Sequence, residues 1–226
     1  MTAAAPAPSL PAHERLLLGP GPSLISPRVM RALAAPMLSH LDPQFLELMD
    51  DTRARLARVF QAPEGSFAFA VSGTGTSAME TAVANLVAPG TRVLCIVTGY
   101  FGDRLAQMCA RYGGEVERVD VEWGRACDPE AVARAIDASN AAIVTVVHAE
   151  TSTGVLNPVK EVAAAAHRAG ALVVVDAVTS LGAMPLDTAG WEAHWQRVEY
   201  DVAGAAAAIR AARLPDSLAE RLGYGQ

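Results

Sequence analysis

Short apolar runs that alternate with helical stretches between residues 67 and 175 constrain the fold of this chain most strongly. The runs cover residues 67–71, 93–97, 116–119, 141–147 and 172–175. The helical stretches lie near residues 77–86, 103–112, 129–138 and 159–169. Strands without in/out alternation, separated by helices, are typical of a parallel sheet covered on both faces. We therefore predict an α/β fold with a mostly parallel sheet flanked by helices.

The segment before residue 67 predicts one strand and two helices. Residues 16–18 are three leucines that indicate a short strand, which the turn at Gly19–Pro22 ends. Ser26-Pro27 and Asp42-Pro43 each predict an N-cap followed by the first helical residue. We expect the first helix to end near residue 34 and the second near residue 60.

We divide the chain into three parts. Residues 1–15 mix Ala, Pro and Ser without periodicity and predict a flexible arm. Residues 16–190 predict a ligand-binding domain, and residues 191–226 predict a helical tail because an Ala-rich amphipathic stretch begins at Trp191. The sheet pattern does not continue into this tail, so we expect the fold to be incomplete.

Composition argues for small-molecule chemistry in a cytoplasmic protein. The net charge of −6 is spread along the chain, so neither a nucleic-acid footprint nor a basic membrane patch is expected. The chain has no apolar run of the roughly 20 residues that a membrane span needs. Three cysteines without C-x-x-C spacing argue against a disulfide framework or a thiolate zinc site, and we predict no metal site.

The turn after the run 67–71 predicts an anion site. Ser72-Gly-Thr74-Gly75-Thr76-Ser leads into a helix, which gathers backbone N–H groups, small hydroxyls and the positive end of a helix dipole. An ordinary strand-to-helix turn with a hydroxyl cap is an equally good interpretation. A dinucleotide fingerprint also fits the spacing, but the next run ends in Thr-Gly without the acid that a ribose needs.

Three other predicted strand ends carry polar or aromatic residues. Asp176 could pair with a pyridine nitrogen, although a helix cap or a metal ligand is a competing interpretation. Phe101, in Gly-Tyr-Phe-Gly, could stack on a planar ring or belong to the core. His148 and Glu150 precede the hydroxyl of Thr151 and could simply be a polar pair that holds the loop. Together with the phosphate cradle, these features meet the needs of one ligand, pyridoxal 5′-phosphate (PLP).

Five segments in order resemble the class V aminotransferase family of fold type I, of the alanine/serine–glyoxylate kind. These are Leu-Leu-Gly-Pro-Gly-Pro (17–22), Ser-His-Leu-Asp-Pro-Gln-Phe (39–45), Ser-Gly-Thr-Gly-Thr (72–76), His-Ala-Glu-Thr-Ser-Thr-Gly (148–154) and Val-Asp-Ala-Val-Thr-Ser-Leu-Gly (175–182). The resemblance covers residues 15–190. It implies a PLP-dependent transaminase acting on a small amino acid and a 2-oxo acid such as glyoxylate or pyruvate, in a homodimer.

The resemblance also implies individual roles. The phosphate is expected at Thr74, Gly75 and Thr76. Phe101 is expected to stack on the ring where the family usually has tryptophan. Thr151 is expected to reach the ring hydroxyl and Asp176 the pyridine nitrogen. Gly21 and Pro22 are expected to help shape the amino-acid pocket.

The family's Schiff-base lysine is expected about two dozen residues after Asp176, but residues 200–204 are Tyr-Asp-Val-Ala-Gly. Lys160 is the only lysine, and it lies near the start of a predicted helix rather than at a strand end. We therefore predict no catalytic lysine and an inactive or impaired transaminase. An internal deletion after residue 190 would explain the pattern. The alternative is a non-catalytic protein that binds PLP or another phosphate, or that dimerises with an intact homologue.

Overall fold

The computed structural model describes residues 16–184 together with Ala207 and Arg210. Its main sheet has the strand order β2-β1-β3-β6, and all neighbouring strands are parallel. The strands are β1 (Arg92–Val97), β2 (Glu115–Asp120), β3 (Ile143–Val147) and β6 (Leu172–Asp176). A short antiparallel pair, β4 (Ala149–Glu150) and β5 (Val155–Leu156), follows β3.

Six helices accompany these strands in the described part of the chain. They are α1 (Pro27–Leu33), α2 (Pro43–Val59), α3 (Gly75–Leu86), α4 (Tyr100–Arg111), α5 (Pro129–Ser139) and α6 (Val159–Arg168). The four strands of the main sheet alternate with helices, as the apolar periodicity predicts. The predicted α/β fold with a parallel sheet flanked by helices is confirmed.

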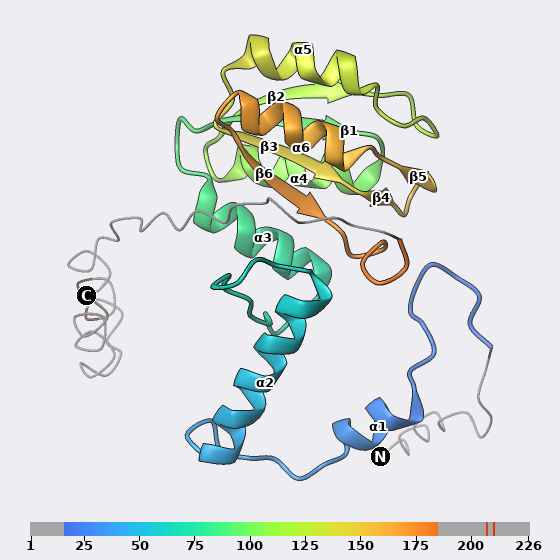
Figure 1. The fold of residues 1–226 in the computed structure, drawn as a ribbon, viewed down its shortest axis with the longest axis vertical. Helices are drawn as coiled ribbons and strands as arrows, with labels where there is room; N and C mark the ends of the chain where they lie inside the picture. Colours follow the sequence, from blue (N-terminus) through green and yellow to red (C-terminus); the bar gives the residue numbers. More distant parts are fainter. Residues whose placement is uncertain (1–15, 185–206, 208–209, 211–226) are drawn as a thin grey trace, which may run out of the picture.

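Helices cover both faces of the sheet (Figure 1). On one face, Leu94 and Ile96 of β1 pack with α5 and α6, which contribute Ile136 and Val162 among others. On the other face, the alternate β1 residues pack with α3 and α4, where Leu105 is buried. Because successive side chains of a strand point to opposite faces, both sides of an apolar run are buried, as its lack of alternation indicates.

The N-terminal helices lie outside these layers (Figure 1). Both start as predicted: the Ser26 hydroxyl accepts a hydrogen bond from the N–H of Arg28, and an Asp42 carboxylate oxygen accepts one from the N–H of Gln44. Neither α1 nor α2 contains a buried residue, although their apolar faces are formed. Their local sequence therefore determines that α1 and α2 are helices, but it does not determine which part of a protein packs against their apolar side chains.

Two predicted strands are wrong. Residues 67–71 are not a strand, and among the described strands none pairs with them. The Arg53 guanidinium lies 4.9 Å from the Phe67 ring centre, and its Nε donates to the carbonyl of Ala68 at 3.1 Å. Residues 16–18 are not a strand either, and the Leu18 side chain is 86% exposed. An apolar run becomes a strand only where a neighbour supplies the hydrogen bonds of a ladder.

The predicted tail at 191–226 and the 200–204 segment lie outside the described residues, apart from Ala207 and Arg210, which are both helical. The predicted arm at 1–15 lies outside them entirely. Among the described residues, no helix is long and apolar enough to cross a membrane.

Candidate cofactor site

Helix α3 begins with an open turn. Thr74 is its N-cap, and the Thr74 N–H donates to the Ser77 hydroxyl at 3.3 Å. A Cβ on Gly73 would lie 2.6 Å from that hydroxyl, so only glycine allows this close approach. The first N–H groups of a helix have no partner within the helix, and this first turn contains no acidic residue. The turn is therefore a capped helix start, and its backbone N–H groups without a nearby carboxylate also suit an anion.

An arginine from α4 reaches this cradle. Arg104 donates from one guanidinium nitrogen to the Thr76 hydroxyl at 2.8 Å and from another to the Tyr100 hydroxyl at 2.5 Å. Its guanidinium carbon also lies 4.9 Å from the Tyr100 ring centre. A cavity of about 380 Å³ opens here between α3 and α4, and Thr76, Tyr100 and Arg104 are part of its wall. Sequence reasoning missed Arg104, because the helix predicted at 103–112 left out Tyr100, so the spacing of four residues between the two was not visible as a helical pair.

A buried carboxylate holds the start of α4. Glu150 is completely buried, and its two oxygens accept hydrogen bonds from the N–H groups of Phe101 and Gly102 at 3.3 and 3.1 Å. The Ser152 hydroxyl donates to Glu150 at 2.6 Å and accepts from the Tyr100 N–H at 2.9 Å. Phe101 itself is partly buried against the core and meets the Tyr100 ring edge-on at 5.3 Å.

Hydroxyl groups connect the β4–β5 turn with the segment after β6. The Thr151 and Thr179 hydroxyls are hydrogen-bonded to each other. His148 Nδ1 and the Ser180 hydroxyl are 2.9 Å apart, and burial lowers the pKa of the imidazole. His148 and Glu150 are thus both satisfied, but by different partners rather than by each other.

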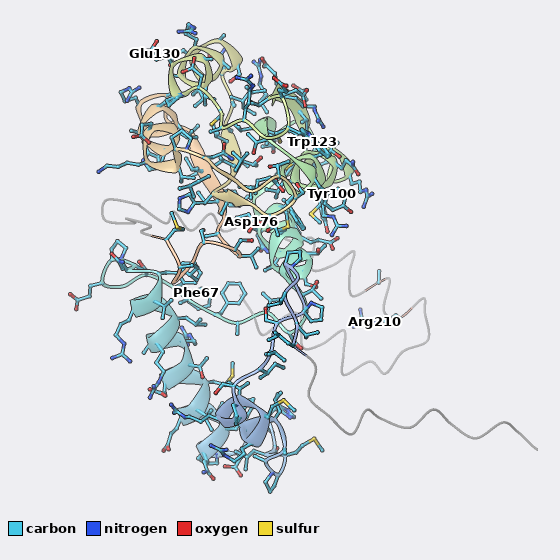
Figure 2. The ribbon with its side chains drawn as sticks, turned by 90° about the vertical axis from the view of Figure 1, so that its right-hand side faces the viewer. Phe67, Tyr100, Trp123, Glu130, Asp176 and Arg210 are labelled. Carbon is cyan, nitrogen blue, oxygen red and sulfur yellow. The ribbon has the colours of Figure 1, made fainter. Side chains whose placement is uncertain are left out.

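Asp176 ends β6 opposite Val147 of β3 in the register of the sheet. One carboxylate oxygen accepts from the N–H of Val178 at 3.0 Å, which forms a local turn. Burial raises the pKa of the Asp176 carboxyl, the Val178 hydrogen bond opposes the rise, and the negative charge of Glu150 adds to it. Figure 2 shows Asp176 and Tyr100 on the side of the sheet layers that faces α2.

The strand-end residues form one connected cluster. The α3 turn contacts the segment after β6, since a Cβ on Gly75 would lie 3.5 Å from Cγ2 of Val178. Arg104 links the α3 turn to α4, and Glu150 links α4 to the β4–β5 turn. Thr74, Gly75, Thr76, Phe101, Thr151 and Asp176 therefore all belong to elements that meet at the carboxyl edge of the sheet, where ligands of such folds bind.

Two predicted substrate residues are not part of this cluster. Gly21 and Pro22 are exposed and precede α1, and nothing lies within 4 Å of the position a Gly21 Cβ would take. Lys160 is exposed near the start of α6. Among the described residues, no group of three or more His, Cys, Asp or Glu side chains could hold a metal ion.

Known proteins resemble this chain in sequence. The Aminotransferase class-V family profile matches residues 18–194. The chain is 42% identical over 172 residues to an uncharacterized aminotransferase of Methanocaldococcus jannaschii. The aligned residues make up 76% of this chain and 44% of that protein. It is 34% identical over 178 residues to the (S)-ureidoglycine–glyoxylate transaminase of Bacillus subtilis. Here the aligned residues make up 79% of this chain and 42% of that protein.

A solved structure agrees with the sequence matches. The crystal structure of alanine–glyoxylate aminotransferase from Nostoc sp. superposes with a TM-score of 0.77 and 45% identity, over 80% of this chain and 48% of that one. The chain thus spans less than half the length of these relatives. Enzymes of this family depend on PLP, and the fold, the cradle and the profile match agree: the chain belongs to the class-V aminotransferase family.

Proposed function

We propose that this chain is the PLP-binding part of an aminotransferase that moves an amino group between a small amino acid and a 2-oxo acid such as glyoxylate or pyruvate. The observation that carries the proposal is the cluster at the carboxyl edge of the sheet. There the α3 turn contacts the segment after Asp176. Relatives named as alanine–glyoxylate and ureidoglycine–glyoxylate transaminases support this substrate class.

The donor set of the cluster fits PLP. The N–H groups of the α3 first turn and the hydroxyls of Thr74 and Thr76 would hold the phosphate, as helix N-termini do. Phe101 would cover the ring, and Thr151 would bind the ring hydroxyl. Asp176 would bind the pyridine nitrogen and keep its proton there, because a charge-assisted bond stabilises the protonated ring. When bound, the cofactor supplies an electron sink for the carbon that exchanges the amino group.

We further propose that this chain binds the cofactor but transaminates poorly or not at all. The family's lysine is absent from residues 200–204, and the exposed Lys160 on α6 lies apart from the cluster in the fold. Without a lysine at the site, the residue that would exchange places with the amino donor and then move the proton is missing. Gly21 and Pro22 remain candidates for the amino-acid pocket, contributed from outside the cluster.

The proposal can be tested by titrating the chain with pyridoxamine 5′-phosphate and following the ligand's fluorescence. We expect saturable binding that Asp176→Ala weakens at least tenfold, and no transamination of alanine with glyoxylate. PLP followed by borohydride reduction probes the lysine directly. A reduced adduct on a peptide of this chain, accompanied by turnover, would contradict the proposed impairment, and absence of any binding would contradict the cofactor site.

A second candidate is a non-catalytic protein that binds PLP or another phosphate, or that pairs with an intact homologue. The observation that favours it is the absence of a lysine from the cluster of described residues. We propose a dimer in either case, because α1 and α2 contain no buried residue and expose apolar side chains such as Val29 and Leu46. Sedimentation of the chain alone and with a full-length relative distinguishes self-association from pairing with that relative.

We also propose that the protein works in the cytoplasm. Cys95, Cys109 and Cys127 are all free and buried, which suits a reducing compartment. Burial raises the pKa of the Cys127 thiol to about 11, so this thiol stays protonated and unreactive at neutral pH. Fractionation of cells that express the tagged chain tests the location.

A further inference from the structure

Two helices begin at the candidate cofactor site, and their first turns differ in charge. Helix α3 has no acidic residue in its first turn. Helix α4 has Asp103 in its first turn and also receives the Glu150 carboxylate from the β4–β5 pair. A carboxylate at a helix N-terminus neutralises the positive end of the dipole. Of these two helices, only α3 therefore offers a phosphate an N-terminus without a carboxylate.

The Glu150 carboxylate is an unusual group to bury. It is completely buried, and its partners are the N–H groups of Phe101, Gly102 and Ser152 and the hydroxyl of Ser152. Burying a carboxylate is costly unless hydrogen bonds compensate for the lost water. Here half of the compensation comes from the N–H groups of Phe101 and Gly102 and half from Ser152, so the orientation of the backbone at Phe101 is tied to the carboxylate.

The backbone before Phe101 lies directly against Ser152 and Glu150. A Cβ on Gly99 would lie 2.5 Å from the Ser152 hydroxyl and 2.6 Å from Cγ of Glu150. The Tyr100 N–H donates to the same Ser152 hydroxyl. Three successive N–H groups at the start of α4, from Tyr100 to Gly102, are thus held by Glu150 and Ser152.

We propose that Glu150 is a positioning residue that sets Phe101 over the cofactor ring and reserves the α3 turn for the phosphate. The inference rests on the proposed cofactor site, since it assigns Phe101 to the ring. It predicts that loss of the carboxylate harms binding of the ring and spares binding of the phosphate. A residue that merely stabilised the fold would affect both alike.

The first experiment needs no ligand. We expect Glu150→Gln to raise the hydrogen-exchange rates of the Phe101 and Gly102 amides about tenfold or more, because an amide side chain accepts with one atom where the carboxylate accepts with two. Amides in the centre of β3 serve as the internal control and should be unchanged. Unchanged exchange at Phe101 and Gly102 would overturn the proposal. So would an equal increase throughout β3.

The second experiment measures affinity with two probes. These are 4′-deoxypyridoxine 5′-phosphate, which has the ring but no aldehyde, and inorganic phosphate, followed by ³¹P NMR. We expect Glu150→Gln to lower the affinity for the ring-bearing probe about tenfold, while the affinity for inorganic phosphate changes less than twofold. In a Phe101→Ala background, Glu150→Gln should have no further effect on the ring-bearing probe. Equal weakening of both probes, or an undiminished effect in that background, would contradict the proposal.

Ser152→Ala provides a milder variant if Glu150→Gln does not fold. It removes the hydroxyl that donates to Glu150 and accepts from Tyr100, and the same selective loss is expected at about threefold. If the wild-type chain binds neither probe, the proposed function fails. The exchange experiment then still decides whether Glu150 positions the start of α4.

Discussion

Gly75 and Val178 lie against each other across the candidate site: a Cβ on Gly75 would be 3.5 Å from Cγ2 of Val178. Gly75 is the first residue of α3, and Val178 follows Asp176 by two residues. The turn suited to a phosphate and the carboxylate suited to a pyridine nitrogen are therefore neighbours, although about a hundred residues separate them in the chain. This contact brings the segment after Asp176 against the first residue of α3, as the proposed cofactor site requires.

Asp176 should make the stability of the free chain fall as pH rises. Its pKa is raised above the ordinary value of 3.8. At pH values between the ordinary and the raised pKa, the native state therefore binds more protons than the unfolded state. The free energy of unfolding then decreases as pH rises from the ordinary value through the raised pKa. Urea unfolding at a series of pH values should show this slope, and Asp176→Asn should flatten it. Asp137→Asn, which alters an exposed carboxylate of α5, is the control and should leave the slope unchanged.

His148 should act in the opposite direction at higher pH. Burial lowers the pKa of its imidazole below the ordinary 6.5, so near and below that value the unfolded chain takes up a proton that the native chain does not. Stability is therefore full above pH 6.5 and is lost as pH falls towards the lowered pKa. We expect His148→Gln to remove this loss in urea titrations, whereas His167→Gln, at an exposed site in α6, should not. An identical pH profile for wild type and His148→Gln would show that the imidazole is not coupled to folding.

Gly99→Ala should disturb the site from within. The added Cβ would overlap the Ser152 hydroxyl and the Glu150 side chain, both of which are tied to α4. Overpacking of this kind costs about 1–3 kcal/mol of unfolding free energy. Gly19→Ala is the matched control, because its nearest neighbour would be 4.0 Å away. Thermal unfolding should separate the two variants, and equal melting temperatures would contradict the close approach of Gly99 to Ser152 and Glu150.

Arg104→Gln should weaken binding of phosphate ligands with little effect on stability. The substitution removes the charged donor to the Thr76 hydroxyl and the contact with the Tyr100 ring. Arg104 thereby positions the Thr76 hydroxyl that we propose for the phosphate, and loss of one Thr76–phosphate hydrogen bond of about 1 kcal/mol would raise the dissociation constant of pyridoxamine 5′-phosphate roughly fivefold. Arg111→Gln, further along α4 on the wall of the same cavity, is the control. Similar losses in both variants would indicate a general charge effect instead of a specific contact.

The apolar periodicity was sufficient to predict the sheet and the helices that cover it. The four strands β1, β2, β3 and β6 and all six helices lie where runs and caps indicate, within a few residues. Ser26 and Asp42 begin their helices because a capping side chain and the following proline act locally. The strand predictions for segments 16–18 and 67–71 are wrong because a strand, unlike a helix cap, depends on a distant partner. Their composition favours strands but does not specify that partner.

The sequence by itself determined the six helices, the four strands of the main sheet and the residue types that stand at their ends. Only the tertiary structure decided how those ends are connected. Glu150 caps a helix that begins fifty residues earlier in the chain, and Arg104 supports a hydroxyl on another helix. The physical reason is range: helix caps and apolar periods act over a few residues, whereas these hydrogen bonds exist only because parallel strands bring distant loops to one edge of the sheet.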